Sequence, residues 1–284
     1  MKIAVHKKRR ELIEKLQKGG IDAPAFEAGL FMCHFFSVDQ KTLMSNVGME
    51  IEEEDLEELE KAVGKRLSGE PLQYILGQWE FMGLPFFVEP GVLIPRSDTE
   101  ILVERALEQM NEEDRGLSVL DMCSGSGCIG IAIAAFCEQA RVMQWDYSQK
   151  AVALAQKNIQ LNELTGRVSC REVDIFQAQG GAATFDYVLC NPPYLTKEDM
   201  ENLQKEVSYE PEDALYGGED GLDYYRFICE NFWENIRRGG WLFFEGGASQ
   251  EKDIRDIMEK AGFAQIRTFK DYGGNFRVIC GKRA

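Results

Sequence analysis

The chain has 284 residues, 44% of them hydrophobic, and a formal net charge of −16 at pH 7. This hydrophobic content excludes a disordered chain, and the length predicts about two domains. No apolar stretch reaches the ~20 residues that a membrane span requires, and the N-terminus lacks the apolar core of a secretory signal, which favours a cytoplasmic protein without a membrane partner. The acidic charge weighs against binding of DNA, whose phosphates need a basic surface, and suits a basic protein partner; simple solubility explains it as well.

The cysteine and histidine content weighs against a metal centre. The eight cysteines form no CxxC pair, and only two histidines are present. Most of the cysteines lie in apolar runs, which is typical of reduced, buried thiols in a cytosolic protein. We therefore expect no metal site and no nucleophilic triad that depends on histidine.

Residues 1–72 are predicted to form a domain of helices only. The helical spacing of apolar residues indicates a first helix that ends near Gly19. Asp22 is expected to cap a second helix, and Asp39 a short third one. Residues 52–69 form the fourth, with acidic residues in its first turn and leucines on one stripe.

Residues 73–99 and 100–284 follow a different pattern. In 73–99, short β-prone runs alternate with Gly and Pro, which predicts a hairpin connector. In 100–284, strands and helices alternate, which predicts an α/β fold with a Rossmann-like, doubly wound sheet. The final two strands, joined by a Gly-containing loop, predict an antiparallel edge strand. The expected strands are 117–122, 140–146, 167–174, 185–190, 240–245, 264–269 and 276–281, and the expected helices are 100–110, 127–139, 148–162, 224–236 and 249–261.

A glycine motif, Gly125-x-Gly127-x-x-Gly130, follows the first of these strands and opens a helix. Glycines there allow a ligand to approach the backbone, and the helix N-terminus supplies free N–H donors. The motif alone fits NAD, FAD or S-adenosylmethionine, and it also fits a purely structural turn. Asp121, at the end of the strand, favours S-adenosylmethionine, because a carboxylate repels a pyrophosphate but attracts sulfonium and ammonium groups.

Acidic residues end the next two strands. Asp146 can accept hydrogen bonds from both ribose hydroxyls of a nucleoside, or it can cap the following helix. Asp174 lies where an adenine edge is expected, and Ile175 and Phe176 can cover the ring. The alternative is that Asp174 is a capping residue and that the other two belong to the core.

Asn191-Pro192-Pro193-Tyr194 ends the fourth strand at the same edge of the sheet. A planar amide or amino-purine nitrogen is a poor nucleophile, because its lone pair is delocalised, and its N–H groups need acceptors that fix its orientation. The Asn191 side-chain oxygen and the Pro192 carbonyl can provide two acceptors, and Tyr194 can pack against the planar group. Catalysis would then depend on positioning and electrostatics rather than on a strong base. A plain proline turn is the alternative.

These motifs resemble those of amino-group methyltransferases, and further stretches narrow the resemblance. "GEPLQYILGQWEFMGLPFFVEPGVLIPRSDTEILVE", "YEPEDALYGGEDGLDYYR" and "DYGGNFRVICGKR" are similar to the peptide chain release factor glutamine methyltransferases, the HemK/PrmC family. The resemblance extends from near residue 10 to the C-terminus. It implies a class I methyltransferase that moves a methyl group from S-adenosyl-L-methionine to the side-chain amide nitrogen of the glutamine in the Gly-Gly-Gln motif of bacterial class 1 release factors.

The resemblance also implies roles for individual residues. The N-terminal domain helps to bind the release factor, and we expect the enzyme to act as a monomer. Arg96, Asp98 and Thr99 lie near the site without an assigned role. Two residues depart from the usual pattern: Cys123 replaces a glycine, and Ile175 replaces an aromatic residue. The residues that the resemblance implies for the cofactor are Cys123, Ser124, Gly125, Ser126, Gly127, Asp146 and Ile175, and those implied for the substrate glutamine are Asn191, Pro192, Pro193 and Tyr194. Asp121, Asp174 and Asn191 are further candidates for cofactor binding, because each lies at the end of a strand at this edge of the sheet.

Two other functions fit part of the sequence. An adenine-N6 nucleic-acid methyltransferase explains Asn191–Tyr194 equally well, but it requires a basic groove and usually a target-recognition domain. A nucleotide-binding regulatory module without catalysis explains the glycine motif but gives no use to Asn191–Tyr194.

Overall fold

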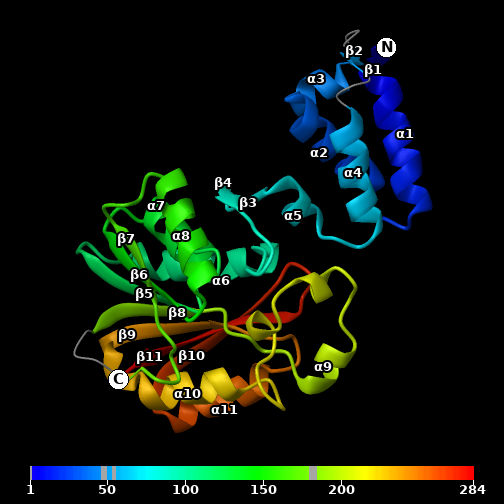
Figure 1. The fold of residues 1–284 in the computed structure, drawn as a ribbon. Coiled ribbons are helices and arrows are strands. Elements are labelled where there is room, and N and C mark those ends of the chain that lie inside the picture. Colours follow the sequence, from blue (N-terminus) through cyan, green and yellow to red (C-terminus); the bar gives the residue numbers. More distant parts are fainter. Residues whose placement is uncertain (1, 46–49, 53–55, 179–183) are drawn as a thin grey trace. The chain divides into compact units, whose positions relative to one another are not determined.

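The computed structural model describes residues 2–45, 50–52, 56–178 and 184–284. Residue contacts divide the chain into two compact units, Met1–Gly77 and Gln78–Ala284 (Figure 1). In the part of the chain that is described, no helix is both long and apolar enough to cross a membrane.

The first unit is mainly helical. Its helices pack around buried residues such as Leu16, Phe31 and Leu59. The elements are β1 (Lys2–Ala4), α1 (Val5–Lys18), α2 (Pro24–Phe36), α3 (Gln40–Met44), β2 (Glu50–Glu52), α4 (Leu56–Leu67) and α5 (Leu72–Leu76).

The prediction of helices only is wrong for this unit, because β1 and β2 pair antiparallel, with Ile3 opposite Ile51. Strands of 3 residues are too short to show a period-2 pattern in the sequence. Asp22 does not cap α2, because Ala23 occupies the cap position and forms no side-chain bond. Asp39 does cap α3: its Oδ1 accepts a hydrogen bond from the Thr42 N–H at 2.7 Å. Of the predicted helix over 52–69, residues 53–55 lie outside the described residues.

The second unit begins with an antiparallel hairpin of β3 and β4 and continues with alternating helices and strands. Its elements are β3 (Gln78–Phe81), β4 (Leu84–Phe87), α6 (Ser97–Met110), β5 (Leu117–Met122), α7 (Cys128–Phe136), β6 (Ala140–Asp146), α8 (Gln149–Leu161), β7 (Val168–Glu172), β8 (Phe185–Cys190), α9 (Lys197–Glu201), α10 (Asp223–Asn231), β9 (Ile236–Glu245), α11 (Glu251–Lys260), β10 (Phe263–Lys270) and β11 (Phe276–Arg283).

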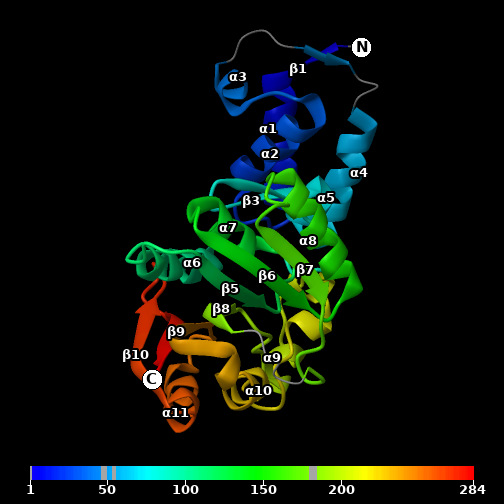
Figure 2. The ribbon, with the colours of Figure 1, turned by 90° about the vertical axis from the view of Figure 1, so that its left-hand side faces the viewer.

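The main sheet of this unit has the strand order β10-β11-β9-β8-β5-β6-β7, which can be followed in Figure 2. Strands β5 to β9 run parallel, and β11 runs antiparallel to both of its neighbours. The predicted doubly wound sheet is confirmed. The predicted antiparallel edge differs in one detail: the antiparallel strand β11 lies one place inside the edge, and β10 is outermost.

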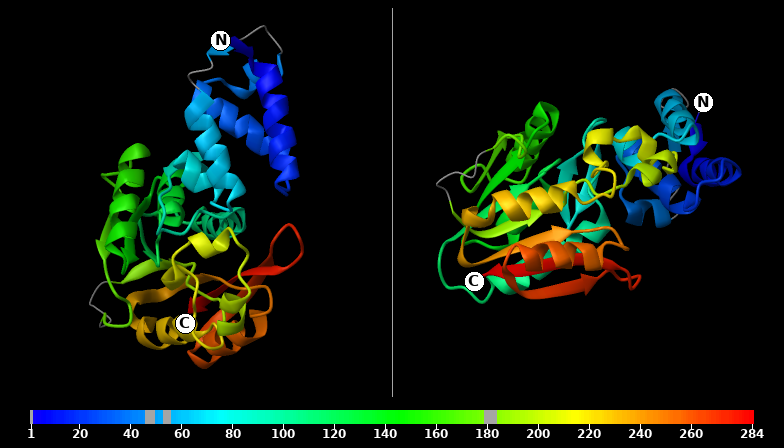
Figure 3. Two further views of the ribbon diagram at one scale, coloured as in Figure 1. Left: turned by 45° about the vertical axis from the view of Figure 1, so that its right-hand side comes forward. Right: turned by 90° about the horizontal axis from the view of Figure 1, so that it is seen from below.

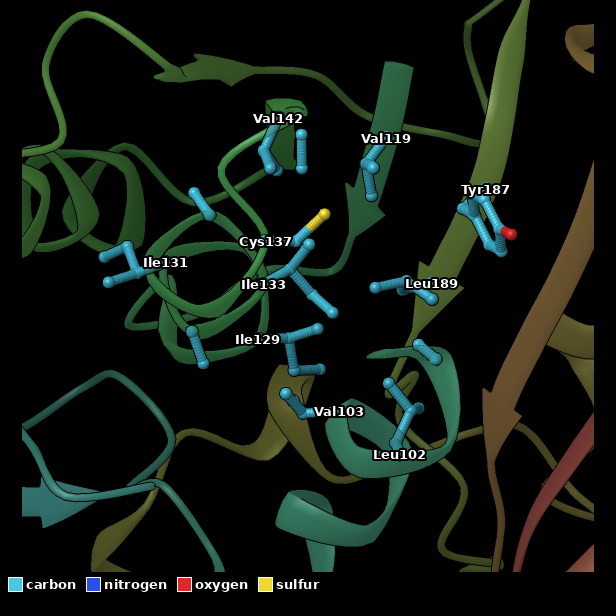
Figure 4. Packing of buried hydrophobic residues seen from close by; sticks show 14 of the residues in the cluster. Leu102, Val103, Val119, Ile129, Ile131, Ile133, Cys137, Val142, Tyr187 and Leu189 are labelled. Carbon is cyan, nitrogen blue, oxygen red and sulfur yellow. The ribbon is translucent and has the colours of Figure 1, made fainter. Parts of the chain in front are cut away.

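Both faces of the sheet are covered by helices, because the strands alternate apolar residues between two cores. Val119 of β5 packs with the buried faces of α6 and α7, as Figure 4 shows. Leu120 and Met122, from the same strand, pack against α10 and α11 on the opposite face, which is turned toward the viewer in the right-hand view of Figure 3. A sheet buried on both faces leaves the carboxyl ends of its strands as the natural place for a ligand.

Candidate functional site

A cavity of about 430 Å³ lies at the carboxyl ends of the parallel strands in the second unit. Strands β5 and β8 are neighbours whose connections leave in opposite directions, so the cavity occupies the switch point of the sheet. Of the predicted site residues, the ones that line it are Cys123, Ser124, Gly125, Ser126, Asp146, Asp174, Ile175, Asn191 and Pro193. In the described chain, no cluster of three or more metal-ligating side chains occurs.

The loop after β5 has the backbone conformation that its glycines allow. Gly125 and Gly127 have φ values of 53° and 84°. Cys123, which replaces a glycine of the usual pattern, also has a positive φ of 56°. Such a conformation costs a residue with a β-carbon about 1–2 kcal/mol. The loop therefore keeps its turn at Cys123 despite the departure from the pattern.

Asp121 lies beneath this loop rather than at the cavity surface. It is fully buried, and its Oδ2 accepts hydrogen bonds from the Gly130 N–H at 2.9 Å and from Gln144 Nε2 at 3.0 Å. Burial raises the pKa of Asp121 to about 7. The carboxyl thus supports the start of α7, and the residues lining the cavity do not include it.

Asp146 does line the cavity, and it also holds the loop. Its Oδ2 accepts from the Gly125 N–H at 2.7 Å, and its Oδ1 accepts from the Ser148 N–H at 2.9 Å. Each oxygen retains acceptor capacity for a further hydroxyl. The cap of α8 is Ser148, whose Oγ accepts from the Ala151 N–H, so Asp146 is not the helix cap. Burial raises the pKa of Asp146.

The segment after β7 forms the next part of the wall. The strand ends at Glu172, earlier than predicted, and Asp174 follows in a turn where its Oδ1 accepts from the Phe176 N–H at 3.0 Å. Ile175 is buried and lines the cavity. Phe176 lies between the rings of Tyr224 and Phe227, at 4.9 and 4.8 Å between centroids. Ile175 therefore supplies an aliphatic surface to the cavity, and Phe176 lines it as well.

Asn191 lies where two cavities meet. It lines the cavity described above and also a second one of about 310 Å³, which Pro192, Tyr194 and Glu245 line as well. Asn191 Nδ2 donates a hydrogen bond to Thr99 Oγ1 at 3.2 Å. Pro192 and Tyr194 thus line the second cavity and Pro193 lines the first, while Asn191 lines both.

Two glycines of the stretch "YGGEDGL" pack against the backbone of this segment. A β-carbon on Gly217 would lie 2.6 Å from the Pro193 carbonyl oxygen, and one on Gly221 would lie 2.3 Å from the Tyr194 carbonyl oxygen. Both distances are shorter than β-carbons tolerate. Because these two glycines have no side chains, their backbone can pack directly against the loop after β8.

Glu210 supports the cavity walls from outside them, and the sequence analysis did not single it out. It is buried, and its carboxylate accepts hydrogen bonds from the Ile94 N–H at 3.0 Å and from the Arg96 guanidinium. Arg96 lines both cavities. Glu210 therefore attaches the segment before α6 to the loop that precedes α10, and both segments form cavity wall.

Asn158 of α8 is a second such residue. Its Oδ1 accepts from the Phe87 N–H at 2.7 Å, and its Nδ2 donates to the carbonyls of Phe87 and Ser126 at 3.1 and 2.9 Å. It is fully buried and joins the end of β4 to the glycine loop. A signal for it exists in the sequence, because it is a polar residue on the apolar face of its helix.

Asn158→Leu is expected to lower the free energy of unfolding by about 3 kcal/mol, because it leaves buried backbone groups of Phe87 and Ser126 without partners. Urea unfolding of the purified chain measures the change. Gln160→Leu is the matched control, since Gln160 lies on the same helix and is exposed. Equal stabilities for the two variants would show that the Asn158 bonds contribute nothing.

The chain is similar to known methyltransferases in sequence and in fold. The chain matches the methyltransferase small domain over residues 97–217 and the PrmC N-terminal domain over residues 8–77. It is 40% identical to a release factor glutamine methyltransferase of Fusobacterium nucleatum, covering 96% of this chain and 77% of that protein. It is 38% identical to the protein of the same name from Geobacter sulfurreducens, covering 94% and 92%. The second unit also shares its fold with a 16S rRNA N2 G1207 methyltransferase of T. thermophilus solved with AdoMet and guanosine (TM-score 0.54, 20% identity, 73% of this chain and 50% of that one).

Proposed function

Because this chain belongs to the family of release factor glutamine methyltransferases, we propose that it transfers a methyl group from S-adenosyl-L-methionine to a side-chain amide nitrogen of a protein. The amide is that of the glutamine in the Gly-Gly-Gln motif of bacterial class 1 release factors. The observation that carries this proposal is the position of Asn191, between a cavity with a nucleoside-type loop and a second cavity.

The first cavity fits S-adenosyl-L-methionine by the chemistry of its walls. The left-handed turn at Gly125 lies in the cavity wall, the Asp146 carboxylate suits ribose hydroxyls, and Ile175 supplies an apolar surface for adenine. Gly127 does not line the cavity, and its positive φ keeps the loop turned at the start of α7. Asp121 supports the loop from beneath. When bound, the cofactor supplies a methyl group activated by its sulfonium sulfur. The residues that we propose to hold it are Cys123, Ser124, Gly125, Ser126, Gly127, Asp146, Asp174, Ile175 and Asn191.

The second cavity is proposed to receive the glutamine side chain. The Asn191 side-chain oxygen and the Pro192 carbonyl accept the two N–H bonds of the substrate amide, and the prolines hold both acceptors in place. Tyr194 packs against the amide plane, and Pro193 completes the turn. These residues position a weak nucleophile, so the rate enhancement comes from orientation. The amide proton displaced by the methyl group is released from the nitrogen after transfer.

The wider setting of the reaction is also proposed. Residues 1–72 contribute to binding of the release factor, and residues 100–284 form the catalytic domain. Residues 73–99 connect these two parts. The net charge of −16 favours a basic protein partner over DNA. We propose a monomeric enzyme of the cytoplasm, where release factors act. An adenine-N6 methyltransferase is the second candidate, since Asn191–Tyr194 fits a planar amine equally well.

The proposal is tested by incubating the purified chain and labelled S-adenosyl-L-methionine with a class 1 release factor and, separately, with duplex DNA. Label is expected in the release factor and not in the DNA. Label in DNA alone would favour the second candidate, and no label in either substrate would contradict both.

Glu210→Gln is expected to weaken binding of S-adenosylhomocysteine about tenfold, because it removes the charge that holds Arg96 and loosens the wall around Ile94. Isothermal titration calorimetry measures the affinity. Glu219→Gln serves as control, because the Glu219 side chain is exposed and, within the described part of the chain, its one ion pair is with Lys197 at 4.0 Å. Equal affinities in the two variants would mean that the Glu210 bonds do not shape the cavity.

A further inference from the structure

Glu245 is a buried carboxyl group in the wall of the second cavity, and the proposed reaction does not use it. It ends β9, one residue after Phe244, which pairs with Cys190 on β8, so Glu245 lies beside Asn191. Its exposed fraction is 1%, and its Oε2 has no hydrogen-bond partner among the described residues. A buried carboxyl oxygen without a partner is costly and is found mainly where function retains it.

Thr99 connects this carboxyl group to Asn191. It lies in the first turn of α6 and is 2% exposed. The Thr99 hydroxyl faces the Glu245 carboxyl group closely enough to lower its pKa, as a donor to an ionised carboxylate does. The same hydroxyl oxygen accepts the bond from Asn191 Nδ2 at 3.2 Å. The three side chains thus form a continuous series in the order Asn191, Thr99, Glu245.

The direction of these hydrogen bonds follows from the inventory of donors. An ionised carboxylate can only accept, and a hydroxyl carries one proton. Thr99 therefore gives its proton to Glu245 and can only accept from Asn191. The Asn191 side chain must therefore turn its NH₂ group toward Thr99. In this orientation its amide oxygen points away from Thr99 and is available to accept a hydrogen bond from a ligand.

We propose that Thr99 and Glu245 are positioning residues that fix the orientation of the Asn191 amide, so that its oxygen accepts the N–H of the substrate amide. Without them, the two amide orientations of Asn191 compete, and in one of them the NH₂ group opposes the N–H of the substrate. This inference rests on the proposed function, which gives the Asn191 oxygen its partner.

The ionisation of Glu245 supports this assignment. Burial raises the pKa of Glu245 to about 7, and the hydrogen bond from Thr99 and the charges of Arg277 and Arg96 oppose that rise. Asp98 and Tyr194 are the other titratable groups that face it. Protonated Glu245 becomes a donor and no longer requires the Thr99 proton. Activity is therefore expected to fall as the pH drops through about 7.

A double-mutant cycle with release factor methylation as the readout tests the inference. Thr99→Val keeps the shape and removes the hydroxyl, and it should lower kcat about tenfold with the KM for cofactor unchanged. Thr99→Ser, which retains the hydroxyl, should stay within about threefold of the unaltered chain. In an Asn191→Ala background, Thr99→Val should cause no further loss, because Thr99 acts through Asn191. Additive losses, or no rescue by serine, would overturn the inference.

The pH profile supplies an independent readout. In Glu245→Gln the fall in kcat below about pH 7 should disappear, because glutamine does not titrate. Persistence of that fall would assign it to another group, such as Asp121, and would overturn the role of Glu245. Binding of S-adenosylhomocysteine to each variant shows that it is folded. If the unaltered chain labels no release factor, the proposed function fails and this inference fails with it, whereas an active chain with additive variants contradicts the inference alone.

Discussion

Asn191→Ala is expected to lower kcat for release factor methylation by about 10²–10³-fold, with the affinity for S-adenosylhomocysteine changed less than about threefold. The substrate nitrogen is a weak nucleophile, so in the proposed mechanism the reaction depends on the orientation that Asn191 imposes. Asn191 is one of many residues that line the first cavity, and the glycine loop and Asp146 line it independently of the Asn191 amide. Loss of the amide should therefore affect turnover and spare cofactor binding.

Steady-state labelling and calorimetric titration separate the two effects of Asn191→Ala. Asn231→Ala is the control, because Asn231 is exposed and its side chain bonds to the Phe227 carbonyl of its own helix. A large loss of cofactor affinity would assign Asn191 to the cofactor. Unchanged kcat would remove it from the chemistry altogether.

Gly217→Ala is expected to lower the free energy of unfolding by about 3 kcal/mol and to abolish most activity. The added β-carbon would lie 2.6 Å from the Pro193 carbonyl oxygen and 2.7 Å from the Tyr194 Cα. Neither contact can be relieved by rotating a side chain, because both atoms belong to the backbone. The segment that carries Asn191 must therefore move.

Urea unfolding and the labelling assay measure both consequences of Gly217→Ala. Gly116→Ala is the matched control, since a β-carbon on Gly116 meets nothing within 4 Å. The control should keep its activity and lie within about 0.5 kcal/mol of the unaltered chain. A Gly217→Ala protein with normal stability and activity would show that close packing behind Tyr194 is unimportant.

The pattern of residues predicted the sheet and the edge where the cavity lies. The strand signals at 117–122, 140–146 and 185–190 match β5, β6 and β8, because each is an apolar run bounded by a turn or loop segment. Asp39 was also correctly identified as a cap. The short pairing of β1 with β2 could not be predicted, since its strands have 3 residues each.

For Asp121, the position in the chain was predicted correctly but the direction of the side chain was not. Its position near the end of β5 suggested that its carboxylate would contact a cationic ligand. In a strand, Asp121 shares a face with Val119, and that face packs against α7. The carboxyl group therefore meets the Gly130 N–H and Gln144 instead of the cavity. The alternation of faces along β5 was the available signal for this placement.

Glu210 and Asn158 were missed because their partners are distant in the chain. The Ile94 N–H that bonds Glu210 is 116 residues away, and the Phe87 N–H that bonds Asn158 is 71 residues away. Local patterns carry no information on such pairs. Thr99 was expected near the site but without a role, and Glu245 was missed, since only the folded chain brings α6 and the end of β9 next to Asn191.

Tandem mass spectrometry of a release factor methylated by this chain shows which atom receives the methyl group. We expect a single added methyl group, on the side-chain amide nitrogen of the glutamine in the Gly-Gly-Gln motif, and none when that glutamine is replaced by alanine. A methyl group on any other residue, or methylation that persists in the alanine variant, would contradict the proposed function.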